Sequence, residues 1–298
     1  MAGFSLAGST VVASRYIGPE IGPFTAVFFS LLAGLPVFVL VARHPAIRSK
    51  SSVRGAQPAA GQIWRALAQA AMGIVAFRVF LLEGMRRIDG PTAGILLGLG
   101  PVLLGLGGIL FFSDRLNQAA WAGVALCSVG VILMRVAPGT QGDPVGALCL
   151  LGAVFGETAM SLLGRRSGEQ GDSFTNAWLT VLAAALLSLP LALAEIIRNG
   201  WPHPAWPGII ALVYYGIGPT ALGYLAWSHG AACLDSASLG VANACTPVSA
   251  VLLSALFLGD GLGPGRLLSL VLVAIGMLAF AGAGRRSPGG RKILADKE

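Results

Sequence analysis

Charged and chemically reactive residues are scarce in this chain. Only 11% of its 298 residues are charged, and it has four cysteines and three histidines. Soluble domains carry about 25% charged residues, so this composition excludes an ordinary soluble fold. The patterns H-E-x-x-H, G-x-S-x-G and G-x-x-x-x-G-K-[ST] are missing, which argues against a zinc hydrolase, a serine hydrolase and an ATP-driven pump. The cysteines have no paired spacing, and we expect no bound metal, cofactor or nucleic acid.

Apolar residues and glycine dominate instead. Hydrophobic residues make up 55% of the chain, the mean hydropathy is +0.77, and 42 residues are glycine. A helix needs about 20 apolar residues to cross a bilayer. The sequence therefore predicts an all-α polytopic membrane protein with ten transmembrane helices. The expected spans are residues 2–17, 22–42, 66–86, 91–112, 118–136, 145–164, 175–197, 206–228, 237–258 and 264–283.

The second half of the chain repeats features of the first at a constant offset of 146 residues. At this offset Pro101 corresponds to Pro247, and Asp114 corresponds to Asp260. The other matches are Gly84 with Gly230, Asp89 with Asp235, Gly94 with Gly240, Phe111 with Phe257 and Gly130 with Gly276. These residue types constrain the backbone or end helices, and they match without a gap. The pattern indicates an internal duplication.

Each copy contains five expected spans, so the second copy enters the membrane from the opposite side. The sequence therefore predicts a five-plus-five inverted repeat, with the first copy at residues 1–137 and the second at residues 145–284. Residues 285–298 form a polar tail that we expect to be disordered. When both termini are placed in the cytoplasm, the inner side carries 13 Lys and Arg residues and the outer side carries six. Cytoplasmic loops are the ones that carry this excess.

A pattern typical of a known group of carriers runs through two consecutive segments of the first copy, and part of it recurs in a third segment, in the second copy. An Ala- and Gly-rich helix contains a proline, an acidic residue follows, and Trp-x-Gly opens another Gly-rich helix. The segments read FLLEGMRRIDGPTAGILLGLGP, FFSDRLNQAAWAGVALCSVGVILM and YLAWSHGAACLDSASLGVANACTPVSAVLLSALFLGD. The pattern resembles the EamA-type families of the drug/metabolite transporter superfamily. This resemblance implies a ten-helix inner-membrane carrier, often an exporter of amino acids, other metabolites or toxic compounds.

The resemblance also implies a central cavity between the two halves. It places Ser9, in Ala7-Gly8-Ser9, at the floor of that cavity and makes it a candidate substrate-binding residue. In a carrier built from inverted repeats, the halves exchange conformations and open the central site to each side in turn.

Arg78 and Glu157 are ionisable residues near the middle of their expected spans. Such residues cost about 2.5–3.5 kcal/mol to insert, so they usually face a cavity or a partner. We expect the two side chains to line the cavity and to pair when no substrate is bound. An amino-acid zwitterion would separate them, with its ammonium group on Glu157 and its carboxylate on Arg78, whose planar fork donates two parallel hydrogen bonds. The alternative is a permanent ion pair that only fixes the helix register.

Glu83 and His229 occupy equivalent positions in the two copies. Together with Glu157, they are the candidates for proton coupling. His229 is included because a histidine side chain titrates near pH 6.5. The alternative for Glu83 is an ion pair with Arg86 or Arg87 on the helix surface. The alternative for His229 is a residue at the membrane interface.

Pro101 and Pro247 each remove a backbone donor in the middle of a span, which makes them candidate hinges. A static kink is the alternative at both positions. Asn243 adds a polar group near Pro247, and Tyr215 lies deep in the most aromatic span. Both are candidate substrate-binding residues, with packing as the alternative for Tyr215.

Together these features predict a secondary transporter of the inner membrane. It would export a small organic solute, such as an amino acid, a related metabolite or a drug-like compound, by alternating access. Protons are the candidate coupling ion, and the protein would act as a monomer or a homodimer. The alternatives are a lipid-modifying membrane enzyme, for which no nucleophile or metal constellation is found, and a non-transporting membrane subunit.

Overall fold

The described part of the chain is helical throughout. The computed structural model describes residues 2–43, 60–112, 117–136, 143–167, 173–226 and 245–284, and within these ranges there is no strand. Five helical stretches there are long and apolar enough to cross a membrane, namely Pro23–Val41, Gly61–Met85, Pro144–Leu163, Phe174–Asn199 and Trp206–Ala226. The all-helical membrane fold is thus confirmed, whereas the count of ten spans stays a prediction.

The described helices divide between the two halves of the chain. The first half contains α1 (Ala2–Gly8), α2 (Thr10–Tyr16), α3 (Pro23–Arg43), α5 (Ala60–Gln69), η1 (Ala70–Ala76), α6 (Phe77–Met85), α7 (Gly90–Leu97), α8 (Gly100–Phe112) and α9 (Gln118–Val136). The second half contains α10 (Pro144–Ser167), α11 (Ser173–Asn199), α12 (Trp206–Tyr215), η2 (Gly216–Gly223), α15 (Cys245–Leu258) and α16 (Pro264–Gly284). The labels η1 and η2 denote π-helical turns.

Two of the predicted spans are interrupted helices. The first, residues 2–17, consists of α1 and α2, which meet at Ser9. The fourth, residues 91–112, consists of α7 and α8, which are separated by Gly98 and Leu99 just before Pro101. Proline has no N–H and disfavours the helical region for the residue before it, which accounts for an interruption at this point.

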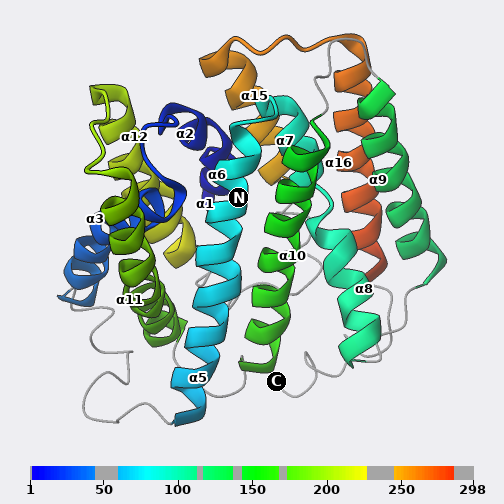
Figure 1. Cartoon of the computed structure of the whole chain (residues 1–298). Helices are drawn as coiled ribbons and strands as arrows, with labels where there is room; N and C mark the ends of the chain where they lie inside the picture. Colours follow the sequence, from blue (N-terminus) through cyan, green and yellow to red (C-terminus); the bar gives the residue numbers. More distant parts are fainter. Residues whose placement is uncertain are drawn as a thin grey trace.

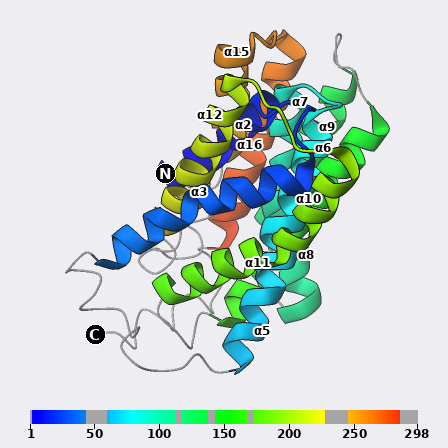
Figure 2. The same ribbon diagram turned by 60° about the vertical axis from the view of Figure 1, so that its left-hand side comes forward.

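The helices lie side by side in one bundle (Figures 1 and 2). Helices α9 and α16 pack along each other at one edge of the bundle, and α3 packs against α11 on the other side. Between these pairs, α10 contacts the continuous helix formed by α5, η1 and α6. The pair α9–α16 approaches closely through glycine, because a methyl group on Gly123 would lie 2.6 Å from the carbonyl oxygen of Gly276. Small residues allow this approach between membrane helices.

Equivalent elements of the two halves begin at the offset found in the sequence. Helix α5 and helix α12 start at Ala60 and Trp206, and η1 and η2 start at Ala70 and Gly216. Helices α9 and α16 start at Gln118 and Pro264. Each of these pairs is separated by 146 residues, so the sequence repeat recurs as a repeat of secondary structure.

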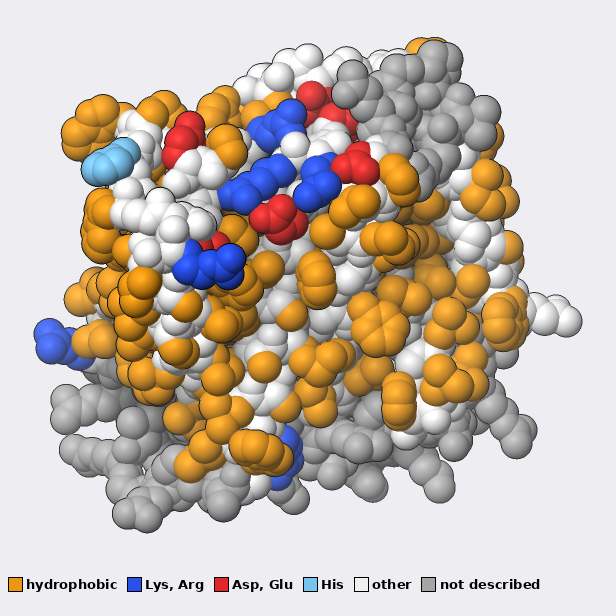
Figure 3. Space-filling view, viewed as in Figure 1, with side chains coloured by type: hydrophobic (Ala, Val, Ile, Leu, Met, Phe, Trp, Pro, Cys, Tyr) orange, Lys and Arg blue, Asp and Glu red, His pale blue; other side chains and the backbone are white. Residues whose placement is uncertain are grey.

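The apolar residues divide between the interior and the surface. One buried cluster joins α7, α9, α10, α15 and α16, and a second joins α3, η1, α6, α11 and α12. Many large apolar side chains remain on the outside, such as Leu110, Leu148 and Ile210. Figure 3 shows a broad apolar area over the middle of one face, with acidic and basic side chains gathered near its upper end. This distribution suits a surface that faces lipid in the middle and water at the end.

Candidate functional site

Arg78 is a buried cation held by hydroxyl groups. Its side chain lies on α6, directly after η1, and the residue is 6% exposed. One guanidinium nitrogen, Nη1, donates a hydrogen bond of 2.8 Å to Ser30 Oγ on α3, and the other, Nη2, donates to Thr220 Oγ1 in η2. The guanidinium carbon lies 4.5 Å from the centroid of the Tyr215 ring, which is a cation–π contact.

The hydroxyl groups around Arg78 use their own protons elsewhere. Ser30 Oγ donates to the carbonyl of Val27 at 2.9 Å, and Thr220 Oγ1 donates to the carbonyl of Tyr215 at 2.6 Å. Each hydroxyl can therefore only accept from the guanidinium, which fixes the direction of both bonds. Within the described residues, no carboxylate forms an ion pair with Arg78. Its positive charge is thus solvated by dipoles and a ring, without a counter-charge.

Unpartnered hydroxyls lie close to this cation. Tyr215 OH and Ser14 Oγ are buried and make no hydrogen bond of standard geometry within the described structure, although the hydroxyls of Ser14 and Thr10 face the Tyr215 OH. Ser9 Oγ lies 2.7 Å from Tyr214 OH. Buried polar groups are almost always satisfied, so hydroxyls without a well-formed hydrogen bond beside a buried arginine make this region the candidate site for a polar ligand.

The space beside the Arg78 side chain is a narrow gap with no room for a water molecule. It is lined by Ile17, Ala26, Val27, Ser30, Arg78, Leu82 and Tyr215. These residues come from both halves of the chain, so Arg78 faces the boundary between the halves. Of the candidates expected from sequence, the structure brings Arg78 and Tyr215 together here, with Ser30, Thr220 and Ser14 as neighbours that the sequence reasoning missed.

Glu157 lies on α10, against η1. A methyl group on the adjacent Gly156 would lie 2.5 Å from the carbonyl oxygen of Met72 in η1, so the two backbones touch at this level. Glu157 is half-buried. The ion pair expected between Arg78 and Glu157 is not formed in the described structure, because Arg78 donates to Ser30 and Thr220 instead.

Glu83 forms the helix-surface ion pair that was the alternative to a coupling role. Its Oε1 lies 2.8 Å from Arg86 Nη1, and Arg86 Nη2 donates to the carbonyl of Ile21 at 2.5 Å. Glu83 and Arg86 also line an open cavity of about 630 Å³ at the ends of α3, α6 and α11, together with Glu195 and His203. The first residue of α6 that lines this cavity, Glu83, lies about one and a half helical turns beyond Arg78.

The proline candidates differ in what the structure describes. Pro101 is the second residue of α8, directly after the interruption between α7 and α8. Pro247 is buried at the third position of α15. Asn243 and His229 lie outside the described residues, and so does the predicted tail at residues 285–298.

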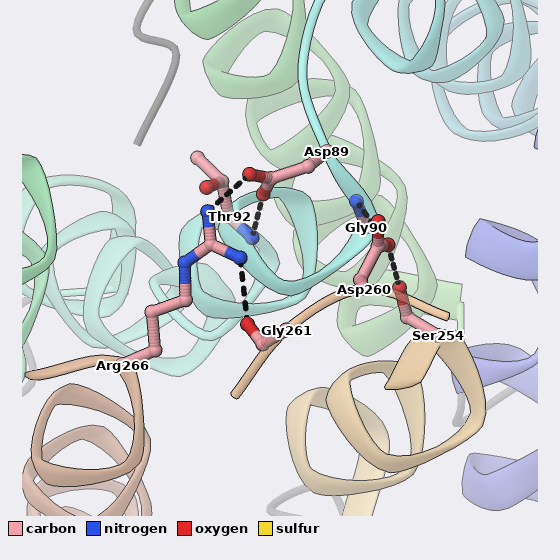
Figure 4. A network of polar contacts seen from close by, with 7 residues as sticks. All are labelled: Asp89, Gly90, Thr92, Ser254, Asp260, Gly261 and Arg266. Atoms are coloured by element: carbon pink, nitrogen blue, oxygen red, sulfur yellow. Dashed lines mark hydrogen bonds and ion pairs between the residues drawn. The ribbon is translucent and has the colours of Figure 1, made fainter. Parts of the chain in front are cut away.

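A polar network joins the two halves at the end of the bundle that is uppermost in Figure 1. Arg266 Nη2, at the start of α16, lies 2.5 Å from Asp89 Oδ2, and Asp89 Oδ1 caps α7 by accepting from the Thr92 N–H at 2.9 Å. Asp260 Oδ2 accepts from Ser254 Oγ at 2.5 Å and from the Gly90 N–H at 3.3 Å. Figure 4 shows these side chains converging from the two halves. We call this set the Asp89–Arg266 network.

Comparison with known proteins relates this chain to a family of membrane transporters. The model of the EamA-like transporter family matches the chain twice, at residues 1–136 and 144–281. The chain therefore belongs to the EamA-like transporter family.

Several relatives carry names that describe transport. The "Uncharacterized transporter YetK" of Bacillus subtilis is 23% identical over 87% of this chain and 78% of its own length. A "Probable terminal-alkyne amino-acid exporter" of Streptantibioticus cattleyicolor is 27% identical over 74% of this chain and 73% of its own length. A "Probable amino-acid metabolite efflux pump" of Salmonella typhimurium is 23% identical over 57% of this chain and 60% of its own length. A crystal structure of another protein has the same fold, with a TM-score of 0.71, 21% identity and 96% coverage of both chains.

Membership confirms the resemblance read from the sequence, and it makes the chain a multi-pass membrane transporter with a small-molecule substrate. The relatives are named as transporters or efflux pumps rather than as enzymes.

Proposed function

We propose that this protein exports a small organic acid of the amino-acid type by alternating access, with Arg78 as the group that binds the carboxylate. The observation that carries the proposal is the buried charge of Arg78, which has no carboxylate partner among the described residues. A charge inside a membrane protein is costly unless it is paired. A transported carboxylate supplies the missing counter-charge and leaves again with the solute.

The chemistry of the site favours a carboxylate. A guanidinium presents a planar fork that matches two carboxylate oxygens. Ser30 and Thr220 hold this fork in place, and the unpartnered Tyr215 OH and Ser14 Oγ can donate to a bound oxygen. The names of two relatives, which mention amino acids, support the same class of substrate.

The other end of the solute is assigned to Glu157. An amino acid carries an ammonium group, and Glu157 is a carboxylate on α10 next to η1, from which α6 and Arg78 continue. We propose that Glu157 binds this ammonium group and that it exchanges a proton for it during the cycle. Glu83 and His229 are secondary candidates for proton coupling, and Asn243 and Ser9 are secondary candidates for substrate contacts.

The proposed transport cycle rests on an inverted repeat of five plus five helices, at residues 1–137 and 145–284. It is supported by the recurrence of α5, η1 and α9 at α12, η2 and α16, and by the two matches of the family model. With both termini in the cytoplasm of an inner-membrane protein, the Asp89–Arg266 network lies on the outer side. Its contacts join the two halves there, on the same side as the open cavity that Glu83, Arg86, Glu195 and His203 line.

The test is solute flux into proteoliposomes under an imposed pH gradient. Three probes share one carbon skeleton and differ in charge, namely L-leucine, L-leucinamide without the carboxylate, and 4-methylpentanoate without the ammonium group. We expect saturable flux of L-leucine above that of protein-free liposomes, and a weaker response to both analogues. Glu157→Gln should lose the dependence on the pH gradient.

Each contrary result has a distinct meaning. Flux of L-leucinamide equal to that of L-leucine would contradict carboxylate binding. Unchanged flux and pH dependence in Glu157→Gln would remove Glu157 from the cycle. Absence of flux for all three probes would contradict the proposed amino-acid class of substrate.

A further inference from the structure

Two π-helical turns occur at equivalent positions of the two halves. Turn η1 covers Ala70–Ala76 and turn η2 covers Gly216–Gly223, so their first residues are 146 apart, as are the residues of the sequence repeat. Residues in π-helices make up well under 1% of globular proteins, and such turns are frequent at functional sites. Both turns adjoin residues of the Arg78 site, because Arg78 follows η1 and Tyr215 precedes η2.

The residues of η2 explain why it departs from the α-helical pattern, in which each backbone hydrogen bond joins residues four apart. Pro219 has no N–H, so the carbonyl of Tyr215 lacks its usual donor four residues later. The side chain of Thr220 donates to that carbonyl at 2.6 Å instead. Turn η1 has Gly73 at the position equivalent to Pro219, and at its end the N–H of Phe77 donates to the carbonyl of Met72, five residues earlier.

Glycines allow other helices to approach both turns closely. A methyl group on Gly216 would lie 2.1 Å from the carbonyl oxygen of Ser30 and 3.0 Å from the N of Gly34, so α3 touches the backbone of η2. A methyl group on Gly156 of α10 would lie 2.5 Å from the carbonyl oxygen of Met72 in η1. These obstacles are backbone atoms, which cannot move aside without moving a helix.

These contacts bring together the groups that hold the guanidinium. The approach of Gly216 to α3 sets Ser30 beside Thr220, and these two hydroxyls accept the two ends of the Arg78 fork. The approach of Gly156 to η1 sets the start of α6, which carries Arg78, against α10, which carries Glu157.

We propose that Gly216 and Gly156 are positioning residues for the carboxylate site, acting through the two π-helical turns. Gly216 fixes the hydroxyls that aim the guanidinium, and Gly156 fixes the separation between Arg78 and Glu157. The role rests on the proposed function, because it concerns how tightly the transported carboxylate is held. The positioning role applies to Gly216 and Gly156 because a side chain there would meet the backbone of another helix, and it does not apply to every glycine of the chain.

The test compares Gly216→Ala and Gly156→Ala with a matched control in the same turn, Gly223→Ala. A methyl group on Gly223 would meet its nearest atom at 3.5 Å, which is ordinary contact. The readouts are KM and kcat for L-leucine and L-leucinamide in proteoliposomes, corrected for the amount of folded protein. We expect both test variants to raise KM for L-leucine at least fivefold with kcat largely kept, to leave L-leucinamide unchanged, and Gly223→Ala to resemble the wild type.

Thr220→Val and Thr220→Ser test the same hydroxyl contact even if a glycine variant does not fold. Valine keeps the shape without the hydroxyl, and serine keeps the hydroxyl, so only Thr220→Val should raise KM for L-leucine. Equal KM values for Gly216→Ala, Gly156→Ala and Gly223→Ala, or a loss confined to kcat or to folded protein, would overturn the positioning role. Absence of L-leucine flux in the wild type would overturn the proposed function and this role with it.

Discussion

Arg78 and Arg266 are both more than nine-tenths buried, with exposures of 6% and 8%, yet their surroundings differ. Arg266 pairs with the carboxylate of Asp89 at 2.5 Å and donates to the carbonyl of Gly261 at 2.9 Å. Among the described residues, Arg78 contacts two hydroxyls and an aromatic ring and forms no ion pair. A buried arginine with a protein carboxylate has a structural explanation. For one without such a partner, we propose a negative charge that arrives with the transported solute.

The largest expected effect comes from removing the unpaired guanidinium. Arg78→Ala should reduce L-leucine flux by at least about tenfold, because a hydrogen bond to a charged group contributes about 1.5–3 kcal/mol and 1.4 kcal/mol corresponds to tenfold. Arg78→Lys keeps the charge without the fork and should recover only part of the flux. Initial rates in proteoliposomes measure both effects. Wild-type flux in Arg78→Ala would contradict the assignment of Arg78 to the binding site.

Next in size is the loss of the proposed ammonium partner. Glu157→Gln keeps the size of the side chain and removes its charge and its titration. We expect L-leucine flux to become independent of the pH gradient and to fall severalfold. The same variant should leave the thermal unfolding temperature nearly unchanged. A coupling ratio equal to that of the wild type would show that another group carries the proton.

The paired arginine should respond in stability and not in affinity. Arg266→Ala leaves Asp89, whose side chain is 20% exposed, without its partner, and we expect a loss of about 1–3 kcal/mol in unfolding free energy. Asp89→Asn should lose a similar amount, since it leaves the buried charge of Arg266 without a counter-charge, while the asparagine oxygen can still cap α7. Thermal unfolding in detergent gives the effect of each change, and the double variant gives the coupling between them. A raised KM for L-leucine in Arg266→Ala would contradict a purely structural role.

The smallest effect is expected at the aromatic wall. Tyr215→Phe keeps the ring beside Arg78 and removes an unpartnered hydroxyl. A neutral hydrogen bond contributes about 0.5–1.5 kcal/mol, so KM for L-leucine should rise about two- to tenfold, without a change for L-leucinamide. Ser14→Ala should act in the same direction. An unchanged KM in both variants would remove these hydroxyls from the binding site.

The sequence was sufficient for the class of protein because composition and repetition are properties of the whole chain. Low charge and long apolar stretches predicted the helical membrane fold, and the offset of 146 residues recurs in the secondary structure. Arg78 was identifiable because a charge inside a span is rare. The Glu83–Arg86 pair followed from helical spacing alone.

The partners of Arg78 could not be predicted in the same way. An arginine and a glutamate at similar depth suggested an ion pair, but depth does not say which way each side chain points around its helix. The π-helical turns change that direction, and only Pro219 gives a local signal for one of them. Ser30 and Thr220 are single hydroxyls in apolar stretches, so their role depends on contacts between helices that lie far apart in sequence.

The central proposal is that Arg78 binds a transported carboxylate. The decisive measurement is the ratio of L-leucine flux to L-leucinamide flux in proteoliposomes for the wild type and for Arg78→Ala. The account predicts a ratio well above one in the wild type that falls towards one in the variant because only L-leucine flux is lost. A ratio that is the same in both proteins would contradict it and would make Arg78, like Arg266, part of the framework of the fold.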